Sequence, residues 1–247
     1  MPTSTVRRYL HKENIYGRTA IPKSLVTVDN AKRRVEWFHN HKTWSIDKWK
    51  TVIWSDESFF TLFPTTGRVH VWRIPAQAYD PDRHRPTVKH GGGSVMVWAA
   101  VSWFSAGPIV TLKGRITGEK YREVLADQVH RTMKILFPAG DGIFQNDNAP
   151  NLAARVVQSW FDEHEDEVEH LPWPPQPPDL DIIEPLWSIL ELSVRNRYPP
   201  PASLTELSRY LHEEWYNIPL NTIKNLYDSI PRRIQAVLHA KGGPTPY

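Results

Sequence analysis

The chain contains no cysteine among its 247 residues, which excludes disulfide bonds and zinc sites built on thiolates. It also lacks any apolar run near the ~18 residues that a membrane-spanning helix needs, so we expect no membrane partner. The HExxH motif of zinc proteases, the P-loop of nucleotide-binding proteins and the GxSxG motif of serine hydrolases are absent as well. The sequence therefore excludes several common classes of enzyme.

The net charge is only +3, but it is unevenly distributed along the chain. Residues 1–50 contain eleven Lys or Arg against four acidic residues, a charge of +7, while the remainder carries −4. A basic segment ahead of an acidic body suits binding to nucleic acid or another polyanion, and a solvated charged face is the alternative. Within this segment, the Lys32–Arg34 triplet fits either a weak nuclear signal or a solvated helix face. The eleven Trp favour core packing, with base stacking as the alternative.

Hydrophobic periodicity predicts a sheet with helices on its faces. Strands are expected at 52–54, 59–63, 69–74, 94–104, 107–114, 143–147 and 167–172, with turns at 57–58, 64–67 and 105–107. Helices are expected at about 4–14, 29–41, 117–137, 151–163, 185–197, 203–217 and 220–240, with prolines 199–201, 219 and 231 as breaks. Strands first and a strand–helix alternation afterwards predict an α/β fold with a mixed sheet.

Three acidic residues stand out by their positions. Asp56 in WSDES and Asp147 in IFQNDNAPN each follow a short apolar run, so we expect both at or just past the end of a buried strand. Ligands of open α/β sheets bind at such edges, and two carboxylates that meet there repel each other unless a cation lies between them. Mg²⁺ prefers oxygen ligands, and two such ions can support in-line displacement at phosphorus. With Glu184, which follows a proline-rich stretch, we hypothesise a shared metal site.

Each acid also has a purely structural interpretation. Asp56 could cap a turn, and Asp147 could open one, because Asp and Asn beside Pro are common in turns. Glu184 could form a capping box with Asp181, since the Asp-x-x-Glu spacing satisfies two amides at a helix start. Pro185 argues against the box, because it would then occupy the fourth helical position. Proline prefers the first position, which would make Glu184 the N-cap.

The blocks WSDES, FQNDNAPN and WPPQPPDLDIIEPLW resemble the three signature blocks of the Tc1/mariner transposases, members of the DDE superfamily with a ribonuclease H-like fold. STVRRYLHK followed by GR is similar to the end of the family's second helix-turn-helix. HGGGSVMVWAAVS resembles its glycine-rich segment, and ITGEKYREVL its following helix. The resemblance covers about residues 3–240. It implies a catalytic domain at 29–247, preceded at 1–28 by a remnant of the helix-turn-helix DNA-binding region and a linker.

This resemblance implies that Asp56, Asp147 and Glu184 are the catalytic triad and bind Mg²⁺ or Mn²⁺, with two ions expected. In the family such a site hydrolyses phosphodiester bonds at transposon ends and joins the freed 3′-hydroxyl to double-stranded target DNA at TA dinucleotides. Gly91–Gly93 would belong to the loop that reaches a partner subunit, which implies a homodimer, and we expect a nuclear protein. Phosphate contacts are expected from basic residues at the N-terminus, namely Arg7, Arg8, Lys12, Arg18 and Lys23.

Four features depart from the family pattern. The gap between Asp147 and Glu184 is two residues longer than usual, and Leu152 stands where many members have His. DLDIIEPLW moves a proline from before the Glu to after it. The chain begins inside the DNA-binding region, so we expect impaired recognition of transposon ends. A relic retained for DNA binding or dimerisation is therefore the alternative to an active transposase, and a structure-specific nuclease is a third.

Overall fold

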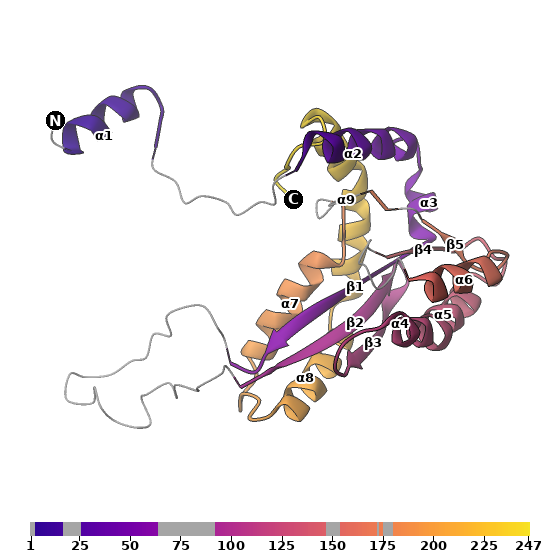
Figure 1. Cartoon of the computed structure of the whole chain (residues 1–247). Coiled ribbons are helices and arrows are strands. Elements are labelled where there is room, and N and C mark those ends of the chain that lie inside the picture. Colours follow the sequence, from indigo (N-terminus) through magenta and orange to yellow (C-terminus); the bar gives the residue numbers. More distant parts are fainter. Residues whose placement is uncertain (1–2, 17–25, 64–91, 147–153, 172, 175–179) are drawn as a thin grey trace, which may run out of the picture.

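A five-stranded mixed sheet forms the centre of the computed structural model, which describes residues 3–16, 26–63, 92–146, 154–171, 173–174 and 180–247 (Figure 1). The strand order is β3-β2-β1-β4-β5. Antiparallel pairing joins β1 to β2 and β2 to β3, whereas β4 runs parallel to both β1 and β5. The bounds are β1 Val52–Thr61, β2 Ser94–Ser102, β3 Ser105–Leu112, β4 Ile143–Gln145 and β5 Glu169–His170. The predicted α/β fold with a mixed sheet is confirmed.

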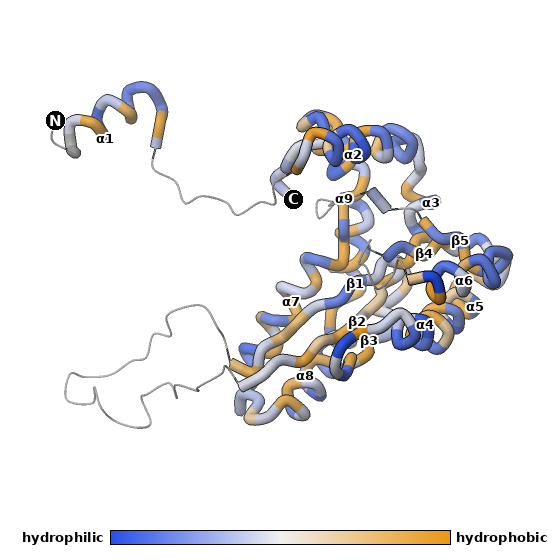
Figure 2. The backbone as a smooth tube through the Cα atoms, viewed as in Figure 1, coloured by the Kyte–Doolittle hydropathy of each residue, from blue (hydrophilic) through white to orange (hydrophobic). Residues whose placement is uncertain are grey.

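Helices cover both faces of this sheet, and apolar segments occur both in the strands and along the helices that pack against them (Figure 2). One face packs against α2 (Val28–His41), α3 (Ile46–Lys50), α7 (Glu184–Arg195), α8 (Leu204–Tyr216) and α9 (Leu220–His239). The other face packs against α4 (Gly118–Val124), the π-helical turn η3 (Leu125–Val129), α5 (His130–Leu136) and α6 (Arg155–Glu163). Each face therefore has its own hydrophobic core, which we call the α7–α9 core on the first face and the α4–α6 core on the second.

Alternation along β1 decides which core each of its side chains enters. Val52, Trp54 and Phe60 belong to the α7–α9 core, whereas Ile53 belongs to the α4–α6 core. Even-numbered residues of β1 therefore face α7. Asp56 shares this parity, so the strand itself directs the Asp56 side chain toward the helix that carries Glu184.

A buried tyrosine fastens the sheet to its longest covering helix. The hydroxyl of Tyr227 in α9 donates its one proton mainly to the carbonyl of Val52, at 2.7 Å, and shares it with the carbonyl of Val101, at 3.3 Å. Because Val52 begins β1 and Val101 lies near the end of β2, one side chain holds both strands. α9 runs through Pro231, which was predicted to break it; the buried Ile230 and Ile234 on either side anchor the helix to the core.

Three further expectations prove wrong in detail. The turn expected at 57–58 does not form, because β1 pairs with β2 without interruption from Trp54 to Thr61. The β2–β3 turn lies at 103–104, and residues 105–107 already belong to β3. Arg34 is buried in α2, where its Nε donates to the carbonyl of Gly242 at 2.8 Å, and so does not belong to a solvated face. The strand expected at 69–74 lies outside the described residues.

The basic N-terminal helix α1 (Thr3–Lys12) presents its charges to solvent. Arg7, Arg8 and Lys12 are all exposed, as expected for groups that contact phosphates. Val6 and Leu10, the predicted apolar stripe, are exposed too. Arg18 and Lys23 lie outside the described residues. Among the helices that the structure describes, none combines the length and apolar character required to span a membrane.

Candidate active site

Asp56 lies in the middle of β1, opposite Ala99 of β2, and not at the end of the strand as predicted. The difference has a simple cause. Parallel pairing with β4 ends at Trp54, but antiparallel pairing with β2 continues to Thr61, so β1 extends past the point where its apolar run stops. On the α7 face, the indole Nε1 of Trp187 donates a hydrogen bond to Oδ2 of Asp56 at 2.8 Å. This bond joins a central strand to α7.

Glu184 is the first residue of α7 and lies one turn before Trp187. Its side chain is exposed, and partial desolvation by the surrounding protein raises the pKa of its carboxyl. The capping box with Asp181 does not form: Oδ1 of Asp181 accepts from the amide of Ile183 at 3.1 Å, and Ile183 is the N-cap. Pro185 lies in the first turn, where its missing N–H is tolerated.

Asp147 lies outside the described residues, but the chain immediately before it is well defined. Gln145 of β4 pairs with Trp54 of β1 in parallel register. The hydroxyl of Ser55 donates to the carbonyl of Gln145 at 2.9 Å, and this bond continues the contact between the two strands beyond their ladder. Both strands are thus held together just before Asp56 and Asp147 are reached in the sequence.

A buried polar network lies beside this strand pair, on residues that we did not single out from the sequence. Asn146 donates to the hydroxyl of Tyr121 at 3.5 Å and accepts from Nε2 of His170 at 2.6 Å. The His170 ring stacks on Phe161, with ring centroids 4.2 Å apart. Burial lowers the pKa of His170, so its neutral ring donates to Asn146 through Nε2–H. Burial, and secondarily the charge of Glu57, raise the pKa of Tyr121.

The sequence contains a signal for this network in the polar pair Gln145–Asn146, which lies at the end of a buried strand. Buried amides require hydrogen-bond partners, and His170 and Tyr121 supply them for Asn146. The network therefore holds Asn146, the residue that immediately precedes the predicted metal ligand Asp147 in the chain.

A second attachment fixes α7 along β1. Arg195, in the last turn of the helix, donates from Nη2 to the carbonyl of Thr61 at 2.7 Å and from Nη1 to that of Leu62 at 3.0 Å. Its Nε donates to Glu191 at 2.8 Å, which restrains the guanidinium. Together with the Trp187–Asp56 bond near the other end of the helix, these contacts fix the position of α7 along β1 and its rotation about its own axis.

The described donors suit a hard divalent cation, since Asp56 and Glu184 both offer carboxylate oxygens. Within the described part of the chain, no cluster of three or more His, Asp or Glu is close enough to hold a metal ion. The third predicted ligand, Asp147, falls outside that part. In the predicted glycine-rich loop, Gly92 and Gly93 adopt φ values of +71° and +87°, a backbone region that favours glycine. Gly91 lies outside the described residues.

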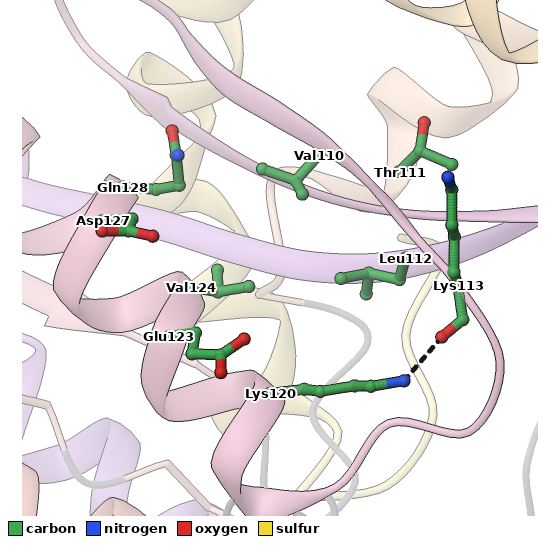
Figure 3. A pocket seen from close by; sticks show the side chains of 9 residues that line it. All are labelled: Val110, Thr111, Leu112, Lys113, Lys120, Glu123, Val124, Asp127 and Gln128. Atoms are coloured by element: carbon green, nitrogen blue, oxygen red, sulfur yellow. Dashed lines mark hydrogen bonds between the residues drawn. The ribbon is translucent and has the colours of Figure 1, made fainter.

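A separate cavity of about 310 Å³ lies between β3 and the α4–η3 helix (Figure 3). Lys120 points toward the strand, and its Nζ donates to the carbonyl of Lys113 at 2.8 Å. Val124, which lines this cavity, belongs to the α4–α6 core, on the opposite face of the sheet from Asp56. Neither Asp56 nor Glu184 is among the described residues that line this cavity.

The sequence is similar to those of known transposases. No family model matches the chain. The Tcb1 transposase of Caenorhabditis briggsae is 39% identical over 98% of this chain and 87% of its own length, and the Tc1 transposase of Caenorhabditis elegans is 38% identical with the same coverage.

Solved structures of Mos1 mariner transposase share the fold. The paired-end complex with Mn superposes with a TM-score of 0.78 at 16% identity, covering 99% of this chain and 72% of that one. The catalytic domain with Mg superposes with a TM-score of 0.67 at 16% identity, covering 90% of this chain and 99% of that domain. The ribonuclease H-like fold expected from the sequence is confirmed. On its identity to the nematode proteins, the chain belongs to the Tc1/mariner family of DDE transposases.

Proposed function

We propose that Asp56, Asp147 and Glu184 form a divalent-metal site that cleaves phosphodiester bonds at transposon ends and transfers the freed strand to target DNA. The observation that carries this proposal is the parallel register of β1 and β4. It pairs Trp54 with Gln145, and each of these residues stands two positions before an aspartate. Glu184 begins the helix that is hydrogen-bonded to Asp56 through Trp187.

Each of the three residues has a distinct role in the proposed site. Asp56 in β1 and Asp147, two residues after the end of β4 in the sequence, would hold Mg²⁺ or Mn²⁺, and Glu184 at the start of α7 would complete the ligand set for two ions. When bound, the metal would activate the attacking oxygen and stabilise negative charge on the phosphate oxygens. The raised pKa of Glu184 supports this role, because a partly desolvated carboxylate is stabilised by a nearby cation. The chain's contribution is positioning, which supplies much of the rate in phosphoryl transfer.

Double-stranded DNA, with transposon ends and TA targets, is the proposed substrate. Arg7, Arg8 and Lys12 on α1 are exposed and would contact phosphates, and we extend this role to Arg18 and Lys23. Such contacts release counterions, so binding should weaken steeply with salt. Solved Mos1 complexes include one with a left transposon end and others described as paired-end, which supports DNA binding and a homodimer here. We further propose that the protein acts in the nucleus.

Cleavage of pre-nicked transposon-end DNA in the presence of Mn²⁺ tests the proposal. Asp147→Asn should abolish the product, whereas Asp228→Asn, an exposed aspartate on α9, should leave it unchanged. Wild-type product from Asp147→Asn would show that the site is wrongly assigned. A wild-type protein that binds DNA but neither Mn²⁺ nor Mg²⁺ would favour the alternative of a binding-only relic.

A further inference from the structure

We propose that Trp187 is a positioning residue of the metal site: its indole N–H fixes the carboxylate of Asp56 relative to Glu184. This inference rests on the proposed function, because it assigns Trp187 a task in the same site. An indole N–H can only donate, so Trp187 can neither bind a cation nor accept a proton. Its contribution must therefore act through Asp56.

The hydrogen bond is well suited to orienting a carboxylate. Nε1 of Trp187 lies 2.8 Å from Oδ2 of Asp56, and only 6% of the Trp187 side chain is exposed. Hydrogen bonds to ionised acceptors are stronger than neutral ones, and low local polarity strengthens them further. Holding one carboxylate oxygen fixes the rotation of the group about its Cβ–Cγ bond. Geometry of this kind is what metal coordination requires from residues behind the ligands.

The indole is itself held in place by packing. Its ring stacks on Trp215 of α8, with centroids 5.3 Å apart and an interplanar angle of 28°, and meets the edge of Phe60 at 6.0 Å. Nε1 of Trp215 donates in turn to the carbonyl of Gly107 in β3 at 2.9 Å. The two stacked indoles thus connect β3 to Asp56 in β1. The donor is preorganised, since turning it away would disrupt both aromatic contacts.

The position of Trp187 in α7 links Asp56 on the strand to Glu184 on the helix. Glu184 lies three residues earlier, one turn along the same helix, so the Trp187–Asp56 bond sets the distance between strand and helix at the point where Glu184 projects. Arg195 holds the far end of α7 to Thr61 and Leu62 and prevents the helix from sliding. Losing the indole N–H should therefore loosen the site locally while the helix stays docked.

Trp187→Phe tests the inference, because it keeps an aromatic ring and removes the N–H. Trp215→Phe is the matched control: it also deletes an indole N–H bond, in the same stacked pair, but one to a carbonyl of β3. We expect Trp187→Phe to weaken Mn²⁺ binding by about tenfold or more in calorimetry and to raise the Mn²⁺ midpoint of DNA cleavage equally. Trp215→Phe should match it in thermal melting and retain wild-type Mn²⁺ affinity.

A second measurement needs no change at Trp187. Asp56→Asn leaves the indole in place but replaces its charged acceptor, so one Trp side-chain resonance in the ¹H–¹⁵N spectrum should move upfield, and in the wild type Mn²⁺ should broaden that resonance before the others. The inference is overturned if Trp187→Phe binds Mn²⁺ with wild-type affinity, or if no indole resonance responds to Asp56→Asn. Full cleavage by Asp56→Asn would instead overturn the proposed function, which keeps the two failures distinct.

Discussion

Trp54 of β1 and Gln145 of β4 are partners in a parallel strand pair, and the hydroxyl of Ser55 extends their contact by bonding to the carbonyl of Gln145 at 2.9 Å. The parallel pairing of β1 and β4 ends at Trp54 and Gln145, although β1 itself continues to Thr61, and residues that follow paired positions of neighbouring parallel strands start from one place on the sheet. In this chain the residues that follow include Asp56 and Asp147. The spacing of the two aspartates from this pair is therefore the structural basis of the proposed metal site.

Glu184→Gln should abolish DNA cleavage without destabilising the fold. The side chain is exposed at the start of α7, so losing its charge costs little packing, but a neutral amide is a poor ligand for Mg²⁺ or Mn²⁺. We expect a loss of more than about 100-fold in cleavage rate, above the effect typical of residues behind the ligands. Glu191→Gln on the same helix is not a neutral control, because Glu191 restrains Arg195; Ser188→Ala, at an exposed position, serves instead. Cleavage at the wild-type rate by Glu184→Gln would remove Glu184 from the site.

His170→Phe should destabilise the protein through Asn146. Phenylalanine can keep the stacking on Phe161, but it removes the donor to Oδ1 of Asn146 and leaves a buried amide oxygen without that bond. A cost of about 1–3 kcal/mol in the free energy of unfolding is expected. Urea unfolding measures it, with His39→Phe at an exposed position of α2 as the control. Equal stability of the two variants would contradict a structural role for the network.

Stability should fall as the pH drops below about 6.5, because three histidines are easier to protonate in the unfolded chain. Desolvation lowers the pKa of His41, His170 and His212 in the folded state, so the unfolded state binds more protons between the folded and unfolded pKa values. The free energy of unfolding should therefore rise with pH across this window and level off above it.

His212→Gln isolates the contribution of His212 to the pH dependence of the free energy of unfolding. Glutamine can still bond to Thr111, whose Oγ1 lies 2.9 Å from Nε2 of His212, but it does not titrate. The variant should show a shallower loss of stability between about pH 7 and pH 5. Because the raised pKa of Glu184 acts in the opposite direction, the comparison is made in the Glu184→Gln background. An unchanged slope would show that His212 is not desolvated in solution.

Tyr227→Phe should weaken the attachment of α9 to the sheet. The substitution keeps the buried ring but leaves the carbonyls of Val52 and Val101 without its hydroxyl. We expect a loss of about 1–2 kcal/mol in the free energy of unfolding. Tyr198→Phe, at a side chain that is 95% exposed, should change stability by much less. Chemical denaturation measures the free energy of unfolding of both variants. A loss in Tyr227→Phe alone is expected, and an equal loss in Tyr198→Phe would contradict the role of the Tyr227 hydroxyl.

Local sequence patterns predicted most of the elements but not the continuity of the central strand. Hydrophobic patterns predicted β2, β3, β4 and most of the helices, since burial of one face imposes a regular period, but they did not predict the short helix α3. A turn was expected at 57–58 because the apolar run is interrupted there by a polar stretch that contains Ser and Asp, which are common in turns. In the folded protein, pairing with β2 outweighs that local preference, and the polar stretch lies within the strand.

Contacts between distant residues could not be predicted from local pattern at all. The Trp187–Asp56 bond joins positions 131 residues apart, and the Arg34–Gly242 bond joins positions 208 apart. From the local sequence, Trp187 is indistinguishable from an ordinary core residue, and Arg34 from the other members of a basic cluster. Their roles depend on which elements the fold brings together, which no periodicity encodes. The three acidic residues were predicted as a site because their surrounding motifs resemble those of a family and because two of them follow short apolar runs, and this assignment stays a prediction.

Calorimetric titration of the wild-type protein and of Asp56→Asn with Mn²⁺ tests the central claim most directly. If Asp56 is a ligand of a divalent-metal site, the wild type should bind Mn²⁺ and the variant should lose that binding while unfolding at a similar temperature. Equal Mn²⁺ affinity in both folded proteins, or none in either, would contradict the proposed site.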